Sequence, residues 1–210
     1  MNLTKLFETQ AALDEHIMQE HPELRGQDNL DWKLLALQVE LGECANEWRG
    51  FKKWSKDQEP RTCVSIDVCS NCGGTGIPLG IPDEAGIDCW KCSGSGEITK
   101  NPLLEEYADV LSFVLSIGNE MDGSLDLFSY LLSKEYKQEI RYAEIDVCDQ
   151  FRKLFRTISR LDMHRNRVNF GEVLADLMGL GKVLGFTTDQ IETAYYAKNK
   201  VNHERQESGY

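Results

Sequence analysis

The sequence predicts an all-α protein, a helical bundle that carries a small cysteine-rich insert. Most of the 210 residues fall into segments whose apolar side chains recur at spacings of three and four. Two of these segments place pairs of acidic residues inside otherwise apolar patterns. Between the two, the composition changes to Gly, Pro, Cys and Ser. We therefore expect a helical core formed by residues 1–56 and 102–210 and a zinc-binding insert at residues 57–101.

The first predicted helix covers residues 3–20 and carries two polar residues within its apolar pattern. Gln10 and Asp14 are four residues apart, so they share one face of the helix. Spacing alone favours a polar helix face for this pair. The loop after this helix contains Pro, Gly and Asn, and Asp31 is the expected N-cap of the next helix.

The segment from Leu34 to Trp54 predicts a helix with an acidic lane. Glu40, Glu43 and Glu47 follow one another at helical spacing. Apolar side chains flank this lane on both sides, which predicts that the carboxylates are at least half-buried. The flanking residues are Leu34, Leu37, Leu41, Cys44, Ala45 and Trp48 on one side and Leu35 and Val39 on the other. Buried carboxylates need a cation or a hydrogen-bond donor.

A second acid-bearing helix is predicted at residues 103–118. Glu106 and Asp109 are three residues apart in a segment that is apolar nearly all round. If this helix faces the previous one, Glu40, Glu43, Glu106 and Asp109 converge in one cluster. Four carboxylates suit hard divalent cations, Mg²⁺ or Mn²⁺.

The net charge of the chain limits the classes of partner that it can bind. Its net charge of −12 argues against a general nucleic-acid coat and against binding to an anionic membrane. The sequence shows neither a long apolar run nor a signal peptide, so we expect a cytoplasmic protein. An acidic protein that handles an anionic substrate needs metal ions to bridge the like charges, and the carboxylate cluster offers a place for them.

The insert contains two copies of a Cys-x-x-Cys-x-Gly-x-Gly motif. The first copy contains Cys69 and Cys72, and the second contains Cys89 and Cys92. The glycines permit the tight turns that direct backbone N–H groups at thiolates, and four thiolates suit a closed tetrahedral Zn²⁺ site. The alternative is an adventitious or redox-active pair. The repeat resembles the zinc-binding repeats of the DnaJ cysteine-rich region, and we expect no disulfides.

Further helices are predicted at residues 125–137, 143–162 and 170–184. A basic strip follows helical spacing in this part of the chain and could meet phosphate or a partner, although a solvated helix face is favoured. The strip consists of Arg156, Arg160, His164 and Arg167.

The last predicted helix begins near residue 188 and projects several polar groups from one face. Tyr195, Lys198, Asn202 and Arg205 recur at helical spacing. Lysine and arginine can grip phosphate oxygens, and an amide can read the edge of a base. Spacing alone would favour a solvated tail.

Together these motifs resemble the dimeric-type dUTPases, within the all-α nucleoside triphosphate pyrophosphohydrolase superfamily that also contains MazG. The C-terminal motif is the part that points to dUTPase rather than to the wider superfamily. The matching motifs are Gln10 with Leu13-Asp14, Glu40-x-x-Glu43, Phe51-Lys-Lys-Trp54, Glu106-x-x-Asp109 and Lys198-Asn199-x-x-Asn202-x-x-Arg205-Gln206-x-x-Gly209-Tyr210.

The resemblance implies Mg²⁺-dependent hydrolysis of dUTP to dUMP and pyrophosphate by a homodimer. It assigns the metal to the four acids and the orientation of the attacking water to Glu40. By the same resemblance, Gln10, Trp54 and Asn202 line the uracil and deoxyribose pocket, with amide groups pairing with O4 and N3–H of uracil. The resemblance implies that the C-terminal residues Lys198, Arg205 and Tyr210 bind the phosphates.

Two features depart from the family pattern. Asp14 stands where some members carry Asn, which bears on the sugar or base contacts, and the segment between the metal motifs is a zinc module rather than a short connection. Two alternatives remain: a pyrophosphohydrolase for another nucleotide such as dCTP, and a regulatory binding protein whose zinc insert contacts a protein or nucleic acid.

Overall fold

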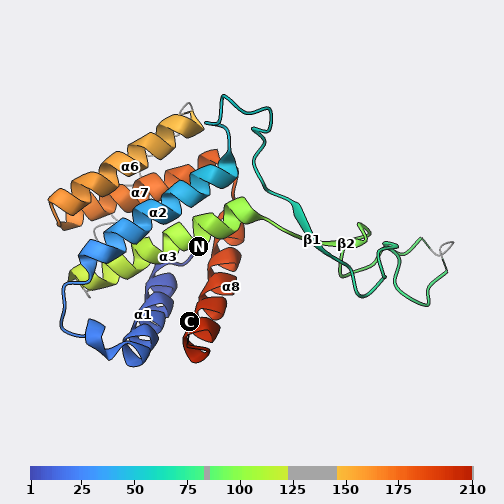
Figure 1. The fold of residues 1–210 in the computed structure, drawn as a ribbon, viewed down its shortest axis with the longest axis horizontal. Coiled ribbons are helices and arrows are strands. Elements are labelled where there is room, and N and C mark those ends of the chain that lie inside the picture. Colours follow the sequence, from blue (N-terminus) through green and yellow to red (C-terminus); the bar gives the residue numbers. More distant parts are fainter. Residues whose placement is uncertain (83–85, 123–145, 210) are drawn as a thin grey trace.

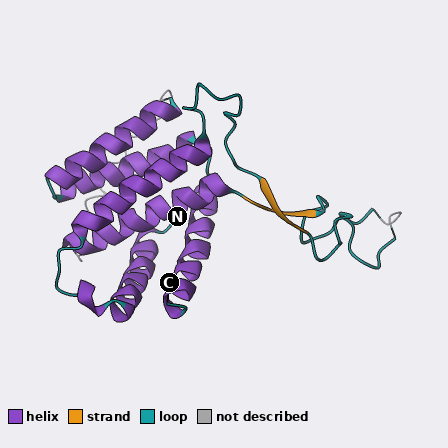
Figure 2. Cartoon of the chain, in the orientation of Figure 1, coloured by secondary structure: helices purple, strands orange, loops and turns teal. Residues whose placement is uncertain are grey.

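The computed structural model describes residues 1–82, 86–122 and 146–209. Figure 1 and Figure 2 show a body of packed helices from which a thin cysteine-rich arm extends. The predicted all-α class is confirmed. The described helices are α1 (Leu3–Glu20), the 3-10 turn η1 (Pro22–Leu24), α2 (Leu30–Trp48), α3 (Pro102–Asp122), α6 (Val147–Met163), α7 (Arg167–Val183) and α8 (Thr188–Glu207).

Helix α3 forms the centre of the body, which explains why its sequence is apolar nearly all round. It packs against α1, α2, α7 and α8. Its side chains Tyr107, Val110, Leu111 and Val114 are fully buried. As the sequence predicts, the helix starts at Pro102, and the side chain of Asn101 accepts a hydrogen bond from the N–H of Leu104.

The bounds of α2 differ from the sequence prediction at both ends. Its N-cap is Asn29 rather than Asp31, which lies in the first turn. The Asn29 side chain donates a hydrogen bond to Leu24 O and accepts one from the indole N–H of Trp32, so it fixes the loop that enters the helix. The helix ends at Trp48 because Arg49 adopts a left-handed conformation with φ 63°, and the chain then turns instead of continuing to Trp54.

The cysteine-rich arm is carried by a two-stranded antiparallel ribbon, with strand β1 (Val64–Val68) paired to β2 (Glu97–Lys100). Val64 lies opposite Lys100, so the ribbon leaves the helical body and returns at one place (Figure 1). Arg61, which precedes the ribbon, links the end of α2 to the start of α3. Its N–H donates to Glu47 O, and its carbonyl accepts from Leu103 N–H. The division of the chain into a core and an insert stays a prediction.

The predicted helix at 125–137 lies outside the described residues. The helix predicted at 143–162 corresponds to α6, and the helix predicted at 170–184 corresponds to α7. The basic strip is exposed on these helices, and Arg160 forms an ion pair with Glu172, as expected of a solvated face. Within the described part of the chain, no helix is long and apolar enough to cross a membrane.

Candidate active site

Three of the four predicted acids meet between α2 and α3. Glu40 comes from α2, and Glu106 and Asp109 come from successive turns of α3. Their carboxylate oxygens lie within 4.8 Å of one another. The two helices form the most extensive contact in the described part of the fold, so their packing fixes this cluster. The sequence prediction that the two acid pairs face each other is confirmed for these three side chains.

Glu43 is placed differently from the other acids. Its side chain is exposed, although the flanking apolar residues predicted at least half burial. The burial prediction is wrong at this position because Leu35 and Val39, on the far side of the lane, are themselves 63% and 50% exposed. Glu43 nevertheless lies near the cluster, since its charge raises the pKa of Glu40, Glu106 and Asp109.

The cluster is electrostatically strained for carboxylates alone. Burial and then the charges of Asp109, Glu43 and Glu106 raise the pKa of Glu40 to about 7. Burial also raises the pKa of Glu106 and of Asp109. Like charges this close disfavour ionisation of the group, and a cation would relieve the strain. This donor set therefore fits hard divalent ions.

Lys198 on α8 supplies the one ammonium recorded in contact with these acids in the described chain. Its Nζ lies 2.6 Å from Asp109 Oδ2, and this contact opposes the rise in the pKa of Asp109. The acid cluster is therefore bordered by three helices: α2 and α3 carry the acids, and α8 carries Lys198. The sequence predicted a polar face of α8 that includes Lys198.

A pocket of about 220 Å³ extends from the acid cluster between α1, α2 and α3. Its walls are mainly apolar, with polar side chains at a few points, as in sites for small organic ligands. Asp109 lies at the junction with the acid cluster. The other lining residues are Gln10, Leu13, Asp14, Ile17, Met18, Leu24, Asn29, Trp32, Lys33, Ser112, Phe113, Ser116 and Asn202.

The predicted pair Gln10 and Asp14 belongs to a buried network rather than to a solvated helix face. Gln10 Nε2 donates to Asp14 Oδ1 over 2.9 Å, and Ser116 Oγ donates to the same oxygen over 3.0 Å. The hydroxyl of Tyr195 donates to Gln10 Oε1 over 3.1 Å. Tyr195 therefore does not point from α8 toward a ligand; it is fully buried and orients Gln10.

The remaining predicted substrate residues differ in their placement. Asn202 lines the pocket, and its Oδ1 accepts a hydrogen bond from Arg205 over 3.4 Å. Trp54 does not line the pocket: its side chain is 78% exposed, and its ring contacts Phe51. Tyr210 lies outside the described residues.

A comparison with protein-family models matches this chain to the family described as dUTPase over residues 2–68 and 84–210. The chain belongs to the dUTPase family. A search of curated proteins found no match. The family reaction is hydrolysis of dUTP, and the all-α fold and the acid cluster of this dUTPase agree with it. The unmatched internal segment, residues 69–83, includes the first Cys-x-x-Cys motif.

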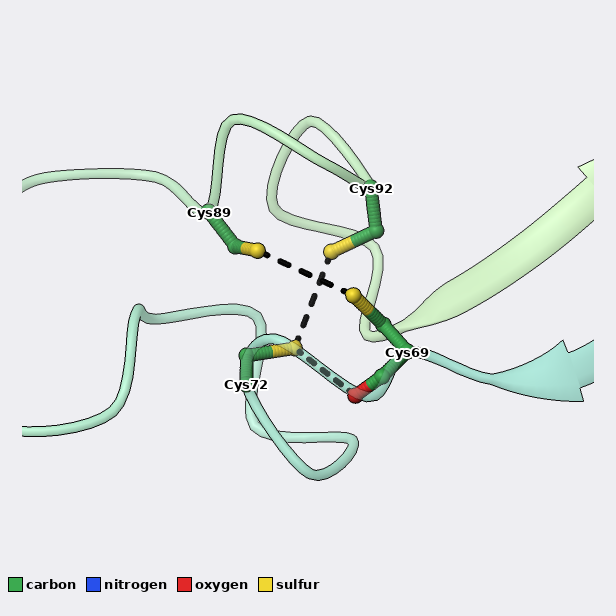
Figure 3. Close-up of side chains that lie close together, drawn as sticks. All are labelled: Cys69, Cys72, Cys89 and Cys92. Carbon is green, nitrogen blue, oxygen red and sulfur yellow. Dashed lines mark hydrogen bonds between the residues drawn. The ribbon is translucent and has the colours of Figure 1, made fainter.

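The four cysteines of the arm form the second candidate metal site of this dUTPase. Their sulfur atoms lie within 4.8 Å of one another, with 3.8 Å between Cys69 and Cys89 and 3.7 Å between Cys72 and Cys92 (Figure 3). Four sulfurs at about 2.3 Å from a tetrahedral zinc ion would be about 3.8 Å apart. The spacing fits the predicted Cys₄ site.

The knuckles also provide donors for thiolates. The N–H of Gly96 donates to Cys92 Sγ over 3.2 Å, and the Asn71 side chain donates to Cys89 Sγ over 3.1 Å. Burial opposes ionisation of Cys89, but the donors around it outweigh this effect and lower its pKa to about 6. Gly76 and Gly96 both have φ 79°, and a Cβ on either would meet a backbone oxygen at 2.3 Å, so both glycines are required.

Several residues of the dUTPase pocket were missed by sequence reasoning. Lys33, Ser116 and Phe113 line it. Helical spacing did single out Tyr195, but not its support of Gln10 from a buried position. The sequence holds one signal for Lys33, which occupies a position on the apolar stripe of α2 four residues before Leu37, where a charged residue is rare. Ser116 and Phe113 carry no such signal, because their role depends on which helix faces α3.

Proposed function

We propose that this dUTPase cleaves its substrate at the cluster of Glu40, Glu106 and Asp109. The observation that carries the proposal is the position of this cluster. Three carboxylates and the Lys198 ammonium lie at one end of a largely apolar pocket, and a buried polar network lies in its wall. A nucleotide can then place its phosphates at the charged end and its base and sugar in the pocket.

The raised pKa values of Glu40, Glu106 and Asp109 mark an acid cluster that lacks sufficient positive charge, which supports binding of Mg²⁺ or Mn²⁺. Glu43, whose charge acts on all three of these acids, is the further ligand in this proposal. A divalent ion at this place supplies charge neutralisation for phosphate oxygens and lowers the pKa of a bound water.

Glu40 is the residue best suited to take a proton from the attacking water. Its carboxylate lies within the cluster, beside the place where an ion would hold the water, and carboxylates commonly act as general bases. Lys198 and Arg205, one above the other on α8, bind phosphate oxygens and stabilise the charge that develops on pyrophosphate. Tyr210 and Trp54 remain candidate substrate contacts on the strength of the family motif.

Gln10, Asp14 and Asn202 hold the base and sugar in this proposal. The aromatic rings of Trp32 and Phe113 line the same pocket and provide flat apolar surface for a pyrimidine. We further propose a structural Zn²⁺ ion at the four cysteines, a homodimeric assembly, a cytoplasmic location, and a protein partner for the arm.

The test is release of pyrophosphate from dUTP, dTTP, dCTP and UTP, each with Mg²⁺ and with EDTA. We expect turnover of dUTP that EDTA abolishes. Turnover of dCTP in preference to dUTP would keep the metal site and overturn the base assignment. No turnover of any nucleotide by folded, Mg²⁺-loaded protein would overturn the proposed function.

A further inference from the structure

Lys33 is a buried lysine in the wall of the nucleotide pocket. Its side chain is 4% exposed, and its ammonium contacts Glu120 Oε2 on α3 at 2.8 Å. The ring of Trp32 lies 5.7 Å from the same nitrogen. An ammonium has three N–H donors, and Glu120 is the one hydrogen-bond acceptor recorded for it in residues 1–82, 86–122 and 146–209. Donors therefore remain for a ligand in the pocket.

Asp14 presents the matching acceptor. Its Oδ1 accepts from Gln10 and Ser116, whereas its Oδ2 is buried and accepts no well-formed hydrogen bond in the described part of the protein. The Asn119 amide also acts on Asp14, but it donates to Phe7 O over 3.1 Å. A buried carboxylate oxygen without a partner is costly, so a donor from a ligand would be favourable. Lys33 and Asp14 both line the pocket, and the charge of Lys33 acts on Asp14.

One donor and one acceptor that line the same pocket can complement the edge of uracil. Uracil offers a carbonyl oxygen beside N3–H, which needs a donor followed by an acceptor. Cytosine offers an amino group beside an unprotonated N3, which needs the same two groups in the opposite order. The proposed function places the phosphates beside Lys198 and the metal-binding acids at one end of the pocket, so the base enters in one orientation and only one order is satisfied.

We propose that Lys33 is a specificity-determining residue that donates to a carbonyl oxygen of uracil while Asp14 Oδ2 accepts from N3–H. The inference rests on the proposed function, because it takes the occupant of the pocket to be dUTP. In this proposal a charged donor and a charged acceptor recognise the base, in place of the amide groups expected from the family resemblance. Glu120 holds the Lys33 ammonium in place and does not touch the base.

The test compares Lys33→Met, Glu120→Gln and the double variant, using kcat and KM for dUTP and dCTP together with the melting temperature. Methionine keeps much of the volume of lysine and removes the donor. We expect Lys33→Met to lower kcat/KM for dUTP by about 10- to 100-fold, mainly through KM, because a hydrogen bond from a charged group is lost. The preference for dUTP over dCTP should fall by a similar factor.

The Glu120 variants separate recognition from folding. Glu120→Gln breaks the ion pair but keeps the ammonium, so it should retain the preference for dUTP. The double variant removes both charges of the Lys33–Glu120 pair and tests recognition even if Lys33→Met alone fails to fold. Wild-type preference in the double variant, or equal loss of preference in Glu120→Gln, would overturn the role of Lys33. Absence of dUTP turnover by the wild-type protein would instead overturn the proposed function.

Discussion

The two candidate metal sites differ in what holds their ligands in place. The acids of the first site project from α2 and α3, which are fixed by buried side chains such as Leu37, Leu41 and Leu111. In the arm, the buried cluster consists of the cysteines themselves with Ile98 as their apolar neighbour in the described chain. Packing therefore holds the carboxylates of the core together, whereas the arm has little besides its thiols to organise it.

This difference predicts different responses to metal removal. Where packing holds the ligands, loss of the ion removes chemistry and leaves the fold, as expected for Glu40 and its neighbours. Where the ion replaces a hydrophobic core, loss of the ion unfolds the module, as expected for the arm.

Substitution of the acids should have the largest effect. Glu40→Gln and Asp109→Asn each remove a carboxylate from the cluster, and we expect kcat for dUTP to fall by at least about 100-fold. Their melting temperatures without Mg²⁺ should not fall, because like-charge repulsion is reduced. Glu105→Gln is the matched control, since Glu105 pairs with Lys100 at the surface. Substantial activity in Glu40→Gln would rule out this site.

Lys198→Met should have the next largest effect. It removes the ammonium at 2.6 Å from Asp109 and a proposed phosphate contact, so kcat/KM for dUTP should fall by about 10- to 100-fold. Lys200→Met on the same helix is the control, because Lys200 is exposed and pairs with Glu204. Equal effects of the two substitutions would contradict a specific role for Lys198.

Stabilisation by Mg²⁺ should increase with pH. The pKa of Glu40 rises from 4.5 to about 7 on folding, so between these values the folded chain binds more protons than the unfolded chain. The free energy of unfolding without metal therefore falls as pH rises through this window. Mg²⁺ would offset that loss, and the Mg²⁺-induced rise in melting temperature should be greater at pH 8 than at pH 5.

Glu40→Gln is the control for this pH dependence, and its response to Mg²⁺ should change less between the two pH values. A wild-type Mg²⁺ effect that is equal at pH 5 and pH 8 would show that ionisation of the cluster is not linked to metal binding.

Substitution in the arm should have the smallest effect on catalysis. Cys72→Ser combined with Cys92→Ser should reduce bound zinc from one ion per chain to none, while turnover of dUTP stays within about twofold, as expected of distant, independent sites. Zinc content and turnover are measured on the same sample. Cys63→Ser is the control, because Cys63 is exposed and lies outside the cluster. A large loss of turnover would show that the arm supports the active site.

Much of the fold could be predicted because its signals are local. The spacing of apolar residues predicted α1, α3 and α7, and the two Cys-x-x-Cys motifs predicted a cluster that the structure forms. The C-terminal end of α2 could not be located in this way, since the apolar pattern continues past the left-handed turn at Arg49.

The active site could be predicted only in part. The acids could be predicted because Glu40 and Glu43 lie within one helical turn, as do Glu106 and Asp109. Lys33 and Tyr195 depend on contacts with residues 87 and 185 positions away in the sequence, and no local pattern contains such pairings. The exposure of Glu43 likewise depends on which face of α2 is covered.

Shortening the arm and measuring Mg²⁺-dependent hydrolysis of dUTP tests whether the helical core holds the catalytic site without the arm. Because Val64 and Lys100 are cross-strand partners, residues 65–99 can be replaced by a short Asn-Gly turn that keeps Arg61 and its contacts. We expect the shortened protein to contain no zinc, to stay folded and to hydrolyse dUTP within about twofold of the wild-type rate. A folded, Mg²⁺-binding protein that no longer hydrolyses dUTP would contradict this expectation.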